Sequence, residues 1–115
     1  MQYENLIMGI TKTKLFSEHQ NNIANLAKAI GHPARIAILE YLIKIDGCIC
    51  NDIVAELGLA QPTVSQHLRE LKSVGIIKGN IEGKAICYCI DQEILNKISA
   101  FFLMINMKIE AKKCC

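Results

Sequence analysis

The chain has 115 residues, enough for one ordinary domain with a single hydrophobic core. Hydrophobic residues make up 51% of it and aromatic residues only 5%, so we expect an aliphatic core. The net charge of +2 is too small to indicate nucleic-acid binding by itself, and any DNA contact must come from local clusters of Lys and Arg. Neither a membrane-spanning apolar stretch nor the basic start of a signal peptide is present, which predicts a cytoplasmic protein without a membrane partner.

Two helices are predicted at the start of the domain. Apolar residues recur at helical spacing up to Gly31, which suits a helix C-terminus, so we predict a helix over residues 17–30. A second helix begins at Pro33, because proline is tolerated at the first helical position, and it stops at Asp46-Gly47.

The next segment predicts two short helices joined by a tight turn. Residues 51–58 form the first, with Asn51 as its N-cap and Gly58 as its end. Three residues later Gln61 opens another helix, which runs to Gly75. This arrangement is a helix-turn-helix.

A hairpin and a long helix complete the chain. Residues 76–81 and 84–91 are β-branched segments on either side of the turn candidate Glu82-Gly83, which indicates a wing. Residues 92–109 are helical by propensity, but their apolar side chains cover more than one face, which a monomer this small cannot bury. The sequence therefore predicts a mainly α (α+β) fold: one winged helix-turn-helix domain over residues 1–115 with a two- to three-stranded wing sheet.

The second helix of the helix-turn-helix presents hydrogen-bonding groups on its outward face. On a helical wheel Gln66 and Arg69 point away from the apolar stripe, with Thr63 and Ser65 at the flanks. In a major groove Gln suits adenine, Arg suits guanine and hydroxyls suit phosphates. If this helix stood alone, its polar face would be interpreted as an ordinary solvent-exposed surface. The preceding helix and the wing favour DNA binding instead. Three lysines are expected to contact the DNA backbone: Lys72, Lys78 and Lys84.

Two runs resemble the arsenic-repressor (ArsR/SmtB) family of metal-sensing transcription factors: KAIGHPAR over residues 28–35 and LAQPTVSQHL over residues 59–68. The similarity spans roughly residues 20–100. It implies a homodimeric repressor whose first and last helices, here within 1–30 and 92–110, form the interface, and whose effector weakens its hold on double-stranded operator DNA. The matched DNA-reading positions are Gln61, Thr63, Ser65, Gln66, His67 and Arg69.

His67 has two interpretations. The resemblance implies DNA contact, but on the helical wheel the residue lies nearer the apolar stripe than the outward face. Packing or a hydrogen bond within the protein is therefore as open for His67 as a contact to DNA.

The six cysteines fall into three close pairs, of which the last, Cys114-Cys115, lies on the C-terminal tail. In winged helices the strand before the helix-turn-helix commonly pairs with the second wing strand. Alternation along these strands would turn Ile86, Tyr88 and Ile90 inward and the cysteines outward. Four thiols would then share one patch and could bind a soft metal or metalloid effector such as arsenite, zinc or cadmium: Cys48, Cys50, Cys87 and Cys89.

Alternatives for these cysteines remain open. Members of the family often carry a Cys-Val-Cys-Asp motif at the start of the helix before the turn. Its two cysteines would fall at Ile49 and Asn51 here, so this chain departs from that pattern by one residue. A thiol-redox sensor that closes disulfides, or cysteines that merely pack, would use the same residues. A cysteine-dependent oxidoreductase is disfavoured, because only Cys50 lies near a helix start and no CxxC pair exists. A zinc-stabilised adaptor is a further alternative. We predict a DNA-binding repressor that requires no cofactor and is not an enzyme.

Overall fold

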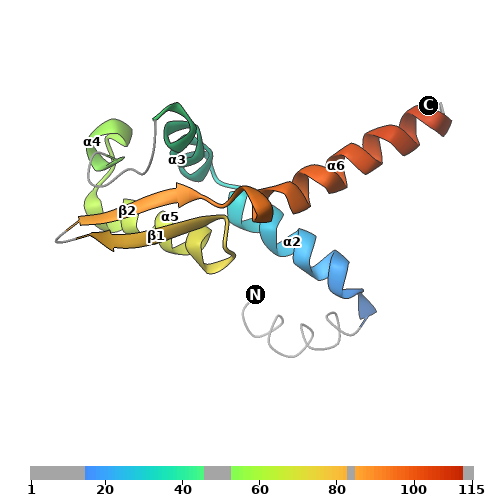
Figure 1. Ribbon diagram of the computed structural model, residues 1–115, viewed down its shortest axis with the longest axis horizontal. Coiled ribbons are helices and arrows are strands. Elements are labelled where there is room, and N and C mark those ends of the chain that lie inside the picture. Colours follow the sequence, from blue (N-terminus) through green and yellow to red (C-terminus); the bar gives the residue numbers. More distant parts are fainter. Residues whose placement is uncertain (1–14, 46–52, 83–84, 113–115) are drawn as a thin grey trace.

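The computed structural model describes residues 15–45, 53–82 and 85–112. These residues form five helices and one antiparallel hairpin, arranged as a compact body from which the last helix projects (Figure 1). The mainly α fold with a small sheet confirms the predicted class. In chain order the elements are α2 (Glu18–Ile30), α3 (Pro33–Lys44), α4 (Ile53–Leu57), α5 (Gln61–Ser73), β1 (Ile77–Glu82), β2 (Ala85–Ile90) and α6 (Gln92–Lys112).

The boundaries of α2 and α3 follow from local hydrogen bonds. Ser17 caps α2: its hydroxyl accepts from the Gln20 amide at 3.0 Å, and the Gln20 side chain accepts from the Ser17 amide at 2.9 Å. Helix α3 starts at Pro33, and the Nδ1 atom of His32 caps it by accepting from the Ala34 amide at 3.0 Å. These caps fix the corner between α2 and α3.

Helices α4 and α5 form the predicted helix-turn-helix. Gly58 ends α4 with a φ of 69°, in the left-handed region that side chains with a Cβ rarely adopt. Leu59 and Ala60 complete the turn, and Pro62 lies in the first turn of α5. Asn51, the expected cap of α4, lies outside the described residues.

The turn glycine yields a stability prediction. A Cβ at Gly58 would meet nothing within 4 Å, so Gly58→Ala adds backbone strain without a clash. We expect the free energy of unfolding to fall by about 1–2 kcal/mol, the cost of the left-handed conformation for an L residue. Gly58→Asn is the matched control and should lose less, because Asn tolerates this region. Urea denaturation measures both, and equal stability of Gly58→Ala and wild type would contradict the assignment.

The wing is a two-stranded antiparallel sheet. Ile77 pairs with Ile90 and Lys78 with Cys89, which confirms the predicted hairpin. Residues 48–50, where a third strand of the wing sheet is expected, lie outside the described residues.

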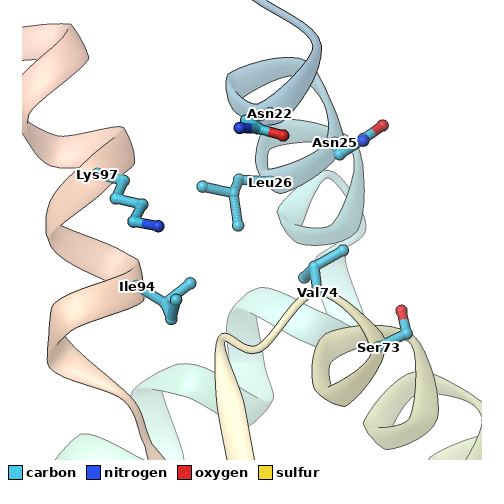
Figure 2. A pocket seen from close by; sticks show the side chains of 7 residues that line it. All are labelled: Asn22, Asn25, Leu26, Ser73, Val74, Ile94 and Lys97. Atoms are coloured by element: carbon cyan, nitrogen blue, oxygen red, sulfur yellow. The ribbon is translucent and has the colours of Figure 1, made fainter. Parts of the chain in front are cut away.

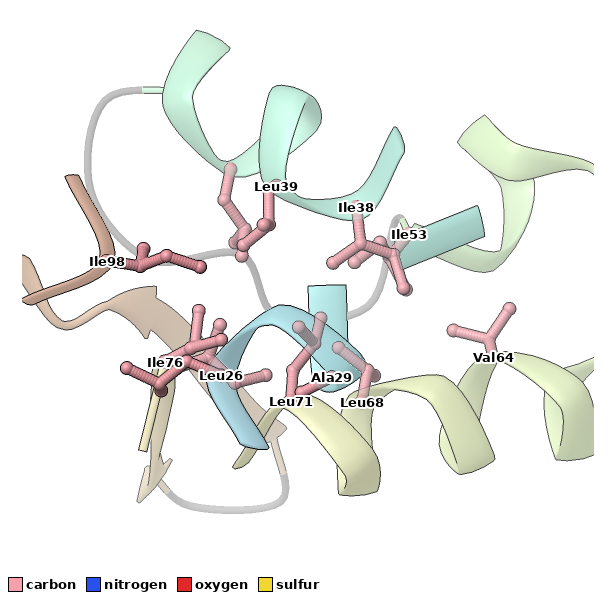
Figure 3. Packing of buried hydrophobic residues seen from close by; sticks show 12 residues of the cluster. Leu26, Ala29, Ile38, Leu39, Ile53, Val64, Leu68, Leu71, Ile76 and Ile98 are labelled. Carbon is pink, nitrogen blue, oxygen red and sulfur yellow. The ribbon is translucent and has the colours of Figure 1, made fainter. Parts of the chain in front are cut away.

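The core lies where α2, α3, α5 and the start of the wing meet (Figure 3). Ile38, Val64, Leu71 and Ile76 are completely buried. In Figure 3 Val64, Leu68 and Leu71 project from α5 toward the other core side chains, so the apolar stripe of α5 faces inward. The opposite face of α5 is thereby left to solvent.

Helix α6 extends well beyond this body (Figure 1). The radius of gyration is 17.0 Å, against about 13 Å for a compact domain of about 100 residues. Five large apolar side chains on α6 are at least 40% exposed: Phe102, Leu103, Met104, Met107 and Ile109. Among the described helices, none has the length and apolar character needed to cross a membrane.

Candidate nucleic-acid interface

Helix α5 separates an inward apolar face from an outward polar one. Val64, Leu68 and Leu71 are buried in the core, whereas Gln66 and Arg69 lie on the opposite side of the helix and are exposed to solvent. Ser65 is half-buried. The exposed members of the predicted DNA-reading set are Gln61, Thr63, Gln66, Arg69 and Lys72.

Hydrogen bonds organise this outward face. One Nη atom of Arg69 donates to the Gln66 side-chain oxygen at 2.7 Å, and the Gln66 amide nitrogen donates to Glu70 at 3.1 Å. One turn earlier, the Gln61 amide donates to the Ser65 hydroxyl at 3.1 Å. These bonds are exposed and therefore of small net energy, so base edges and phosphates can replace them at little cost. The hydrogen bond from Arg69 to Gln66 uses only one of the five N–H donors of the guanidinium group.

The first turn of α5 also offers backbone donors. Ala60 is the N-cap residue, and no described side chain caps the helix. The amide groups of Gln61 and Thr63 lie in this turn, whereas Pro62 has no N–H group. Uncapped amides at a positive helix end suit a phosphate of the DNA backbone.

His67, for which both DNA contact and packing were left open, lies on the inward side of α5. It is 8% exposed, and its Nδ1 atom accepts a hydrogen bond from the Nε atom of Arg35 at 3.2 Å. Its ring lies 4.3 Å from that of His32, between centroids. Burial lowers the pKa of His67, and the nearby His32 and Arg35 lower it further. The geometry thus supports the packing interpretation of His67 and not the base contact.

The lysines of the predicted interface are only partly described. Lys72 and Lys78 are exposed, on α5 and on the first wing strand. Lys84 lies outside the described residues.

Only two of the four cysteines of the predicted patch lie in the part of the chain that the structure describes. Cys87 and Cys89 are both disulfide-bonded, whereas Cys48 and Cys50 lie outside the described residues. Tyr88 packs against the core, as strand alternation predicts, as does Ile90. Cys87 is only 5% exposed, so the expectation that it lies on an accessible outer face of the wing is wrong. Among the described residues no three His, Cys, Asp or Glu side chains gather as a metal site, and the four-thiol site stays a prediction.

A cavity of about 290 Å³ lies between α2, α6 and the end of α5 (Figure 2). Ile94 and Lys97 project into it from α6, opposite Leu26 on α2. Its other lining residues are Asn22, Asn25, Ser73 and Val74. Among these seven residues Lys97 is the only charged group, and the lining contains no carboxylate, His or Cys that could act as a base. The cavity therefore offers no catalytic pair.

Comparison with known proteins agrees with this geometry. Residues 32–78 match the family model described as bacterial regulatory protein, arsR family, a range that contains α3, α4 and α5. An uncharacterized HTH-type transcriptional regulator from Methanocaldococcus jannaschii is 38% identical, over 70% of this chain and 91% of the relative. A homolog of the cadmium resistance transcriptional regulatory protein CadC from Staphylococcus aureus is 32% identical, over 76% of this chain and 72% of the relative.

A solved structure supports the fold. The homodimeric winged helix-turn-helix DNA-binding domain of a possible ArsR-family regulator from Mycobacterium bovis superposes with a TM-score of 0.61 and 24% identity. The match covers 76% of this chain and 81% of that one. The family match and the two relatives show that the chain belongs to the ArsR/SmtB family of winged helix-turn-helix transcriptional regulators, and that it is a regulator and not an enzyme.

Proposed function

We propose that the protein is a homodimeric repressor that reads double-stranded operator DNA with α5, which we call the recognition helix. The observation that carries this proposal is the division of α5 into a buried apolar face and an exposed face of Gln, Thr and Arg side chains. A helix with such a face fits the major groove.

The contacts divide into two kinds. Gln66 and Arg69 form the base-reading pair, because their amide and guanidinium groups match adenine and guanine edges. Gln61, Thr63 and Ser65 lie nearer the helix start, where hydroxyls, amides and backbone N–H groups suit phosphates. The charges of Lys72, Lys78 and Lys84 add affinity that does not depend on base sequence.

Dimerisation follows from the apolar surface of α6. Its exposed apolar side chains are unfavourable in water, and a second copy of the chain can cover them. Residues 1–30 and 92–110 are the proposed interface. Two recognition helices in such a dimer would enter successive major grooves about 34–36 Å apart.

The cysteines are the proposed effector site. Cys87 and Cys89 are disulfide-bonded, which favours control by thiol oxidation: closing a disulfide transfers two electrons to an oxidant and releases two protons. Reduced, the same thiols become thiolate ligands for arsenite or another soft metal, which is the second candidate. Cys48 and Cys50 complete the set in either case. Both effectors would release the operator.

DNA selection tests the proposed DNA reading. Purified reduced protein is offered a pool of random duplexes, and the enriched sequence is measured by gel shift at fixed salt. We expect a two-fold symmetric site with half-sites about 10 base pairs apart. A protein that enriches no sequence would contradict the proposal.

The effector is tested on that selected duplex. Oxidation with diamide should weaken binding by the wild type at least about tenfold, and a thiol reductant should restore it. Cys89→Ser should respond little to diamide, while Cys114→Ser with Cys115→Ser serves as the matched control and should respond like the wild type. Arsenite added to reduced protein tests the second candidate. If neither agent changes binding, the cysteines are structural.

A further inference from the structure

A buried imidazole joins the recognition helix to the corner between α2 and α3. His67 projects from the inward side of α5, and its Nδ1 atom accepts from Arg35 on α3 at 3.2 Å. The His32 ring, at the start of α3, lies against it at 4.3 Å with the planes tilted by 48°. His67 is 8% exposed, and it is the only polar or charged side chain that is buried among the described residues. Such a group must be satisfied inside the protein.

Arg35 connects three elements through one guanidinium group. While its Nε atom donates to His67, one Nη atom donates to the Ala29 carbonyl at 3.0 Å, in the last turn of α2. That carbonyl would accept from the residue four positions later in a continuous helix, but this residue is Pro33, which has no N–H group. Arg35 therefore supplies the missing donor, and its position toward His67 is fixed by the end of α2.

We propose that His67 is a positioning residue of the recognition helix: its neutral imidazole accepts the Arg35 hydrogen bond that holds α5 against the α2–α3 corner, and its protonation breaks this bond and weakens operator binding. This inference rests on the proposed reading of DNA by α5. The arginine cannot give up its proton, so a proton on Nδ1 would leave two donors facing each other.

Two of the charged groups around His67 oppose its protonation, and one favours it. His32 and Arg35 on α3 face the ring, and the carboxylate of Glu70, one turn along α5, acts in the opposite direction. Burial is the largest cause that lowers the pKa of His67. Lys28 on α2, Arg35 and Glu70 also line a nearby cavity of about 420 Å³, together with His32.

The sign of the pH effect follows from this lowered pKa. Above the ordinary histidine value of about 6.5, His67 is neutral in both folded and unfolded chains. As the pH falls below 6.5 toward the lower folded value, the unfolded chain binds the proton first, so the native arrangement loses stability with acid. Operator binding by the folded protein should weaken at still lower pH, as the pH falls through this folded value and His67 itself takes up the proton. Acid has the opposite effect on ordinary protein–DNA association, which it strengthens, because protonated histidines add positive charge.

Operator affinity as a function of pH tests this role. Fluorescence anisotropy on the selected duplex is measured from about pH 7.5 to about pH 5.5 at constant ionic strength, a range that brackets the ordinary histidine pKa. Wild-type affinity should fall severalfold toward the acid end of this range, and by less than about tenfold because the pKa of His67 lies below its ordinary value. His67→Asn keeps an acceptor near the position of Nδ1 but does not titrate. The operator affinity of this variant should lie within about threefold of the wild-type value at the higher pH, and it should change less than about threefold when the pH is lowered.

Two controls isolate His67. His32→Asn retains an N-cap side chain for α3 and removes one group that lowers the pKa of His67, so its acid response should persist and begin at a somewhat higher pH. His67→Leu removes the acceptor and should bind weakly at both pH values. Circular dichroism checks that each variant is folded. An acid response unchanged in His67→Asn, or one lost in His32→Asn, overturns the inference. If the wild type selects no duplex at all, it is the proposed DNA reading that fails.

Discussion

Replacing Arg69 with Ala is expected to remove most sequence-specific DNA binding while leaving the fold and the dimer intact. Arg69 is exposed, and its hydrogen bond to Gln66 lies at the surface, so its loss costs the folded state little. A bidentate Arg–guanine contact is worth about 1–3 kcal/mol, and a dimer makes it twice. Operator affinity should therefore fall by roughly 30-fold to 10⁴-fold.

The control for this variant is Lys72→Ala, on the same helix. Lys72 is expected to contact phosphate, so its loss should weaken binding to all sequences alike and reduce the salt dependence of binding. Gel shifts on the selected duplex and on a scrambled one separate the two effects. Tight, sequence-specific binding by Arg69→Ala would show that the base contacts lie elsewhere.

The second large effect is expected on α6. Leu103 and Met107 are four residues apart and therefore share one face of the helix, at 61% and 63% exposure. Leu103→Asp with Met107→Asp places two carboxylates where the partner helix is proposed to pack, and a charge without a partner is strongly disfavoured in a buried interface. We expect a folded monomer. Its operator affinity should fall at least about 100-fold, because the two half-sites are no longer bound together.

Analytical ultracentrifugation measures the oligomeric state directly. Lys108→Asp is the matched control, because it also adds a carboxylate but lies about 100° around the helix from Met107. This control should remain dimeric. A double variant that still sediments as a dimer would show that another surface of the chain forms the interface.

The element boundaries could be predicted from the sequence because their signals are local. Gly31 and Pro33 mark the corner between α2 and α3, and Gly58 and Gly75 follow α4 and α5, the latter two with positive φ. Each signal acts over a few residues. The wing was predictable for the same reason, since its two strands are adjacent in sequence.

The environment of His67 could not be predicted in this way. Its hydrogen-bond partner, Arg35, is 32 residues away, so the contact depends on how α3 packs against α5. The helical wheel places His67 near the apolar stripe, but only the fold shows that Arg35 lies within hydrogen-bond distance of it. The run His32-Pro33-Ala34-Arg35 held a usable signal, because Pro33 leaves a carbonyl of the preceding helix in need of a donor.

The cysteines illustrate a second limit. Strand alternation correctly placed Tyr88 against the core, but it does not state what covers the other face of the strand. Cys87 was expected to be accessible, but it is buried and disulfide-bonded. Burial on the outer face of a two-stranded wing depends on segments distant in sequence.

Chemical-shift mapping by NMR tests the proposed DNA reading most directly. The selected duplex is titrated into labelled protein, and backbone and side-chain amide signals are followed. The largest changes should fall on Gln61, Thr63, Gln66 and Arg69, with smaller ones at Lys78 on the wing. Changes confined to α6 or to the cavity beside Lys97, with α5 unaffected, would contradict DNA reading by this helix.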